Sequence, residues 1–105
     1  MNAKTSVSRT ILAQLGGNQF LRCTGANRLA QSDASLSFRL PMRTKNKANM
    51  IIITLMPSDT YRVQFWSVRG TRAVRLQQEF DDVYADQLQD VIERATGVYT
   101  TLVPR

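Results

Sequence analysis

Residues 50–78 constrain the fold most, because β-branched and aromatic side chains dominate them and two turn signals divide them. This composition favours strands. Pro57–Asp59 and Arg69-Gly70 are typical of tight turns. We therefore expect an antiparallel meander of three short strands. The expected strands span residues 51–55, 61–68 and 73–77. Such a meander buries one face and leaves the other open, so the open face should carry the main information on function.

Two amphipathic patterns flank this segment. Val7, Ile11 and Leu15 recur at helical spacing and predict a helix over residues 6–15, ended by Gly16-Gly17. A second helix is predicted over residues 83–96. In this helix Leu88 and Ile92 belong to the buried stripe, Asp81 or Asp82 is the N-cap, and Gly97 ends the helix.

The remaining segments predict the rest of the sheet and its connections. Residues 19–23 and 36–40 read as strands, and in the second of these Leu36, Phe38 and Leu40 alternate with polar residues. Residues 26–35 are polar and predict a loop, while residues 79–82 predict a short acidic turn. The fold class expected is α+β: an antiparallel sheet of about five strands with an N-terminal and a C-terminal helix packed on one face.

The length of 105 residues suits one domain with one core. We expect residues 1–101 to form this domain and Leu102–Arg105 to be the remnant of a thrombin-cleavable tag. No long apolar run begins the chain, and the longest one, Met50–Ile53, is far too short to span a bilayer. We therefore expect no signal peptide, no membrane partner and a location in the cytoplasm.

The composition argues against catalysis. The sequence contains no histidine, which is the usual general base and the commonest metal ligand. The single cysteine, Cys23, excludes an intrachain disulfide and has no evident cationic partner that would activate a thiol. Gly16-Gly17 lies at a helix end, so a phosphate-binding glycine loop is not indicated. We expect a protein that is not an enzyme and needs no cofactor and no metal.

Charge is distributed unevenly along the chain. Residues 1–78 contain twelve Lys and Arg against Asp33 and Asp59, a net charge of +10. Residues 79–105 contain two Arg against six acids, a net charge of −4. A basic body with an acidic C-terminal element indicates either a soluble protein of mixed surface charge or a surface that binds polyanions.

The open face of the meander is the first candidate site. Alternation along the strands is expected to place seven side chains there, and these are Arg39, Ile52, Thr54, Arg62, Gln64, Trp66 and Arg75. An aromatic ring among arginines is typical of sheets that bind single-stranded nucleic acid, because bases stack on the ring and guanidinium groups bind phosphate. A protein interface, including a homodimer, and a plain solvated face are the alternatives.

The segment of residues 41–49 is a second candidate. Arg43, Lys45 and Lys47 occur there without an acid, in an expected hairpin loop between two strands. Flexible basic side chains neutralise backbone phosphates without a fixed geometry. The loop is therefore either a phosphate-contacting element or a solvated connection.

The predicted C-terminal helix provides a third candidate. Asp82, Asp86, Asp90 and Glu93 recur at steps of four, four and three, which would align them in one carboxylate stripe. Metal sites usually gather ligands from several elements, so a metal is not expected here. The stripe is either a solvated face or a docking surface for a basic partner protein.

Seven short motifs carry a resemblance to a known family. They are Leu15–Phe20, Thr24–Ala26, Leu36–Pro41, Asp59–Tyr61, Arg69-Gly70, Val83–Leu88 and Thr96–Thr100. Together, over roughly residues 8–102, they resemble a family of small uncharacterised proteins carried by bacteriophages and other bacterial mobile elements. The resemblance implies a bacterial cytoplasm and a genetic setting of replication, transfer or evasion of host defence. It implies no catalytic residues.

Two functions fit these observations. The first is nucleic-acid binding through the basic open face and the basic loop. The second is a counter-defence role of the anti-CRISPR type, in which the acidic helix docks on the basic channel of a host nuclease and occludes it.

Overall fold

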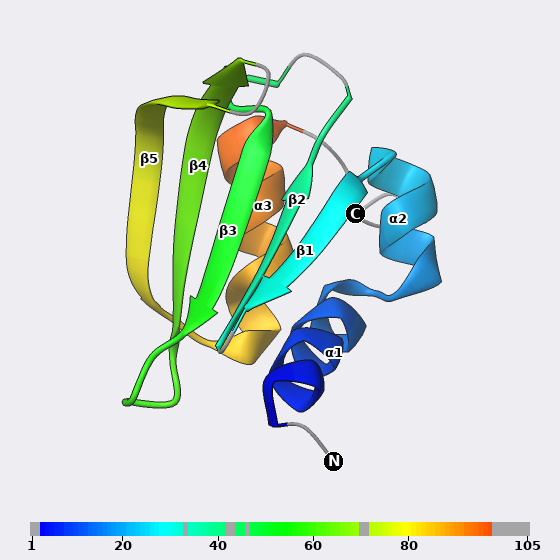
Figure 1. The fold of residues 1–105 in the computed structure, drawn as a ribbon, viewed down its shortest axis with the longest axis vertical. Coiled ribbons are helices and arrows are strands. Elements are labelled where there is room, and N and C mark those ends of the chain that lie inside the picture. The colour runs from blue at the N-terminus through cyan, green and yellow to red at the C-terminus, as the bar shows by residue number, and fades with distance from the viewer. Residues whose placement is uncertain (1–2, 33, 42–43, 46, 70–71, 98–105) are drawn as a thin grey trace.

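In the part of the chain that the structure describes, one antiparallel sheet of five strands forms the frame, and an N-terminal and a C-terminal helix pack on one of its faces (Figure 1). The computed structural model describes residues 3–32, 34–41, 44–45, 47–69 and 72–97. The elements are α1 (Ala3–Leu15), α2 (Asn18–Thr24), β1 (Asn27–Ser32), β2 (Ser35–Arg39), β3 (Met50–Leu55), β4 (Tyr61–Arg69), β5 (Arg72–Val83), the 3-10 helix η1 (Ala85–Gln87) and α3 (Leu88–Thr96). The strands follow each other in the order β1-β2-β3-β4-β5. The expected α+β class is confirmed; Arg43 and the expected tag remnant lie outside the described residues.

The core lies between the sheet and α1 and α3. The register aligns Phe38 with Ile51 and Ile51 with Phe65, and all three side chains are fully buried. Their cover comes from two helices, which contribute the buried residues Ile11, Leu15, Leu88 and Ile92. The amphipathic stripes that predicted the two helices therefore meet the inward side of the meander, as burial of apolar surface requires.

The prediction of a strand at residues 19–23 is wrong, because these residues lie in α2. The helix begins after Gly17 and ends at Gly25, whose φ of 68° is the left-handed conformation typical of a helix end. Phe20 and Thr24, four residues apart, are both buried. Phe20 contacts Phe38 edge to face, with ring centroids 5.2 Å apart. Tertiary packing of one aromatic ring thus overrides the strand propensity of a short apolar run.

The loop predicted at residues 26–35 contains β1, which pairs with β2 at the edge of the sheet. All six residues of β1 are exposed. A strand without a buried side lacks the alternation by which strands are predicted, so the polar sequence of β1 read as a loop.

The acidic turn predicted at residues 79–82 is also wrong, because these residues lie within the twelve-residue strand β5. Three irregularities in the pairing of β5 with β4 interrupt its alternation. The C-terminal helix consequently begins later than predicted, with η1 at Ala85 and α3 at Leu88, and neither Asp81 nor Asp82 is its N-cap. Gly97 ends α3 as predicted, with a φ of 75°.

The aromatic contact between Phe20 and Phe38 should dominate the stability of the region around α2. Replacement Phe38→Ala should lower the free energy of unfolding by about 3–5 kcal/mol, because it removes a fully buried ring and leaves a cavity. The matched control is Phe80→Ala, since Phe80 is 36% exposed and should cost only about 1–2 kcal/mol. Urea denaturation followed by circular dichroism measures both. Equal losses would contradict this account of the core.

Candidate nucleic-acid interface

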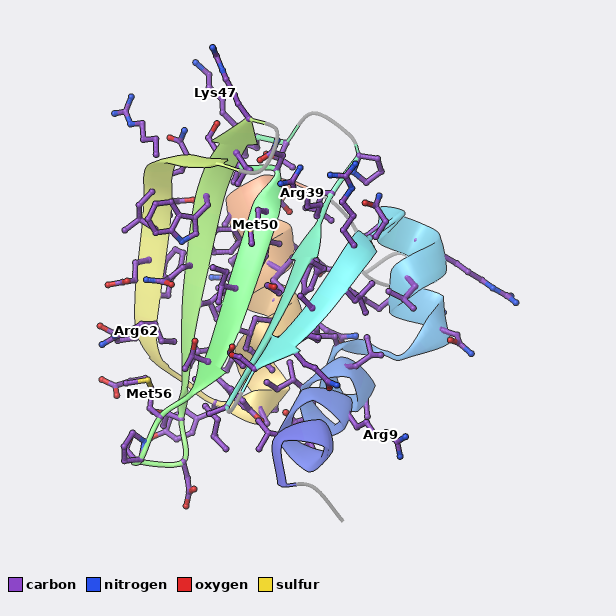
Figure 2. The ribbon with its side chains drawn as sticks, viewed as in Figure 1. Arg9, Arg39, Lys47, Met50, Met56 and Arg62 are labelled. Atoms are coloured by element: carbon purple, nitrogen blue, oxygen red, sulfur yellow. The ribbon has the colours of Figure 1, made fainter. Side chains whose placement is uncertain are left out.

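The face of the sheet away from α1 and α3 carries aligned rows of side chains. The row nearest the β2–β3 connection, here called the Trp66 row, consists of Arg39, Met50, Trp66 and Leu76. The next row consists of Ser37, Ile52, Gln64 and Glu79, and a third contains Ser35, Thr54 and Arg62. Figure 2 shows Arg39 and Met50 near one end of the sheet and Arg62 nearer the other. Six of the seven side chains predicted for the open face are therefore in these rows.

Arg75 is the exception. It pairs with Ser67, one step from the pair of Trp66 and Leu76. Since neighbouring positions alternate, this register takes Arg75 out of the Trp66 row and brings Leu76 into it. The prediction that Arg75 lies on the open face and Leu76 on the inward face is therefore wrong. The physical reason is the irregular pairing of β5, which shifts its sides relative to a regular strand.

Arg62 is paired with a carboxylate, which was not anticipated. Its Nε donates to Oδ1 of Asp81 at 2.6 Å, and the two side chains are 40% and 52% exposed. This hydrogen bond, together with the charge of Asp81, raises the pKa of the Arg62 guanidinium. On the same face, Nε2 of Gln64 donates to Glu79 at 2.6 Å. The charge of Arg62 is therefore balanced locally, and this half of the face is not basic.

Positive charge gathers instead at one end of the sheet, called here the basic end. It consists of Arg39, Lys45, Lys47, Arg69 and Arg75, which come from the end of β2, the β2–β3 connection, the end of β4 and the beginning of β5. The opposite end carries Asp59, Asp81, Asp82 and Asp86. Sequence reasoning missed Arg69. In an antiparallel meander β2 and β4 run in the same direction, so their last residues lie at the same end of the sheet. The sequence therefore contained the information needed to group Arg69 with Arg39.

Backbone contacts hold the connection that carries two of these cations. The backbone N–H of Lys45 donates to the carbonyl of Thr96 at 2.7 Å, at the end of α3. Lys47 has a φ of 65° and donates to Thr44 at 3.1 Å, which closes a tight turn. The side chains of Lys45 and Lys47 are exposed. The predicted basic loop is therefore tied to the fold at the described positions, and Lys45 and Lys47 face solvent.

Asn49 joins this connection to the strand that carries Trp66. Its side-chain amide donates to the carbonyl of Val68 at 2.9 Å, and its side-chain oxygen accepts from the N–H of Val68 at 2.8 Å. Its backbone N–H donates to the carbonyl of Trp66 at 2.9 Å. Three hydrogen bonds from one residue thus fix the connection alongside β4. Sequence reasoning did not single out Asn49, because its partners are nearly twenty residues away.

The four acids predicted to share one helical stripe do not share one element. Asp82 lies in β5 with a φ of 57°, Asp86 lies in η1, and only Asp90 and Glu93 lie in α3. Asp90 pairs with Arg94 at 3.1 Å. The prediction of one carboxylate stripe was wrong because the helix was predicted to begin five residues too early. Within the described residues, no group of three or more acidic or cysteine side chains is placed to hold a metal ion.

Comparison with protein-family models, with curated proteins and with solved structures finds no match. None of the helices in the described ranges is both long and apolar enough to cross a bilayer. The arrangement of the site is therefore the basis for proposing a function.

The Asn49 contacts predict a measurable contribution to stability. Replacement Asn49→Ala should lower the free energy of unfolding by about 1–3 kcal/mol, because it leaves the partly buried N–H and carbonyl of Val68 without partners. Asn27→Ala is the matched control. Asn27 makes an exposed, 3.2 Å hydrogen bond to Gly25, so its loss should stay within about 0.5 kcal/mol. Urea denaturation measures both, and similar losses would show that Asn49 does not anchor the connection.

Proposed function

We propose that the protein binds nucleic acid through the basic end of its sheet and the adjoining Trp66 row. The observation that carries this proposal is that cations from separate segments gather at the end of the sheet where the Trp66 row also lies. A polyanion with a regular array of phosphates matches such a surface, because each neutralised phosphate releases condensed counterions.

The state of the individual cations supports the same conclusion. Within the described part of the chain, no carboxylate pairs with Lys45, Lys47, Arg69 or Arg75. Arg62, in contrast, is paired with Asp81. The contribution of Arg62 to binding should therefore be small, and that of the basic end large. We therefore assign binding mainly to the basic end, and no longer to Arg62 in the middle of the face.

In this proposal the protein acts by binding and not by catalysis. The resemblance to phage and mobile-element proteins suggests the cytoplasm of a bacterial host as its setting. Replication or transfer of a mobile element would supply nucleic acid there as a partner. A homodimer remains compatible with this role.

A specific observation favours the alternative of a counter-defence inhibitor. Tyr84 is 58% exposed, and exposed Asp82 and Asp86 flank it at the acidic end of the molecule. Protein interfaces are often centred on an accessible tyrosine, and carboxylates beside it would suit a basic nucleic-acid channel. This surface lies opposite the basic end, so separate variants test the two functions.

Reversal of charge at the basic end should abolish most nucleic-acid binding. The double replacement Lys45→Glu and Lys47→Glu should weaken binding about tenfold or more at low salt. The number of phosphate contacts obtained from the slope of log affinity against log salt concentration should fall by about two. Fluorescence anisotropy with labelled single-stranded and duplex oligonucleotides, over a series of salt concentrations, measures both quantities.

The matched control changes the net charge equally at another place. Arg9 and Arg22 are exposed on α1 and α2 and do not belong to the basic end, and Figure 2 shows Arg9 near the opposite end of the molecule. The double replacement Arg9→Glu and Arg22→Glu should change affinity by less than about threefold, through screened long-range charge alone. Equal effects of the two double variants would refute a localised site. Absence of binding by the unaltered protein at low salt would refute the function.

The inhibitor hypothesis predicts a protein partner that survives nuclease treatment. The tagged chain would be incubated with host lysate, with and without nuclease, and bound proteins identified by mass spectrometry. A nuclease-resistant partner that Tyr84→Ala loses and Lys45→Glu/Lys47→Glu keeps would support this hypothesis. Loss of all partners after nuclease treatment would support nucleic-acid binding instead.

A further inference from the structure

We infer that the ligand of this face is single-stranded nucleic acid, which crosses the strands of the sheet along the Trp66 row with its phosphates at the basic end. This inference rests on the proposed function and adds to it the class of nucleic acid and the direction of the strand. Three observations carry it: the packing of α1 and α3 on the opposite face, the apolar centre of the row, and the acids that lie beyond the row.

Among the described residues, the open face carries no helix that could enter a duplex groove. In the described part of the chain, α1 and α3 pack on the opposite side of the sheet, and Phe20 of α2 packs against the inward residue Phe38. Many proteins read duplex DNA with a helix that enters the major groove. A single strand requires only a surface on which its exposed bases can lie.

The centre of the Trp66 row is apolar. Met50 and Trp66 are half-buried and Leu76 is 39% exposed, on three adjacent strands. Nε1 of Trp66 is buried and has no hydrogen-bond partner among the residues that the structure describes. The indole therefore presents ring surface rather than a donor to a ligand. Stacking on a ring is tolerant of sequence, because every base has a π-face, and we expect little preference among bases.

Charge decides the direction of the strand. The basic end borders the row on one side, whereas Glu79 and Asp81 lie beyond it on the other side of the same face. A nucleic-acid strand that ran parallel to the β-strands would bring its phosphates towards these carboxylates. A nucleic-acid strand that follows the row keeps its phosphates at the basic end, where Arg39 belongs to the row itself and Lys47 lies in the adjoining β2–β3 connection. The row crosses three inter-strand spacings, about 14 Å, so the site holds only a few nucleotides.

The fluorescence of Trp66 provides the test, because it is the only tryptophan in the chain. A short single-stranded oligonucleotide should quench this emission, since a base stacks on the ring. A duplex hairpin with the same number of phosphates should bind at least about fivefold more weakly, the lower end of what one base–aromatic stack contributes, and should leave the emission unchanged. Titrations at the same low salt concentration compare the two ligands.

Two variants separate stacking from packing. Trp66→Leu keeps apolar bulk and removes the ring, so the preference for single strands should be lost while salt-dependent binding persists. Trp66→Phe keeps a ring and should retain most of the preference. Both are measured by anisotropy with the same two ligands, after circular dichroism has confirmed that each variant is folded.

The outcomes separate this inference from the proposed function. Equal binding of single strand and hairpin, without quenching, would overturn the inference and leave nucleic-acid binding standing. Binding of neither ligand would overturn both. A blue shift of Trp66 emission that depends on protein concentration, in the absence of oligonucleotide, would show that a second copy covers the row and would also overturn the inference.

Discussion

The pairing of β3 with β4 is the constraint on which the rest of the structure depends. Its register aligns Ile51 with Phe65 and Ile53 with Val63 on the buried side, and Met50 with Trp66 on the open side. A shift of one residue would bring Trp66 into the core and expose Phe65, at a large cost in buried apolar area. The hydrophobic effect that holds the core therefore also holds the candidate binding row in place, although no residue of that row belongs to the core cluster.

The second determining contact is between β4 and β5. It brings two acids from the C-terminal part of the chain onto the open face, where Asp81 pairs with Arg62 and Glu79 accepts from Gln64. The net charge of +10 over residues 1–78 consequently does not become a uniformly basic face. Arg62 is neutralised in one half, whereas Lys45, Lys47, Arg69 and Arg75 at the other end pair with no carboxylate among the described residues, so a phosphate backbone should be attracted to that end. The same segregation gives the molecule an acidic end with an exposed Tyr84.

Much of the fold was predictable because strong periodicity and buried apolar residues coincide. The strands at β3 and β4, the N-terminal helix and the α+β class follow from that coincidence. The failures share another cause. Residues 19–23 have a strand-like composition, yet Phe20 gains more from packing on Phe38 as part of a helix. The edge strand β1 has no buried side, and irregular pairing in β5 disrupts its alternation, so neither produced a periodic signal. Arg75 was placed with Trp66 for the same reason.

Local sequence was sufficient to establish which residue types are available for binding: one tryptophan, a basic loop and no histidine. It also placed Arg39, Arg62 and Trp66 on one face, because alternation within a regular strand is a local property. Tertiary structure alone decided which cations are neutralised and which are grouped. Asp81 reaches Arg62, and Asn49 holds its connection beside Trp66, through contacts between residues nineteen positions apart. Such contacts depend on strand order and register, which the whole buried core selects and no single segment encodes.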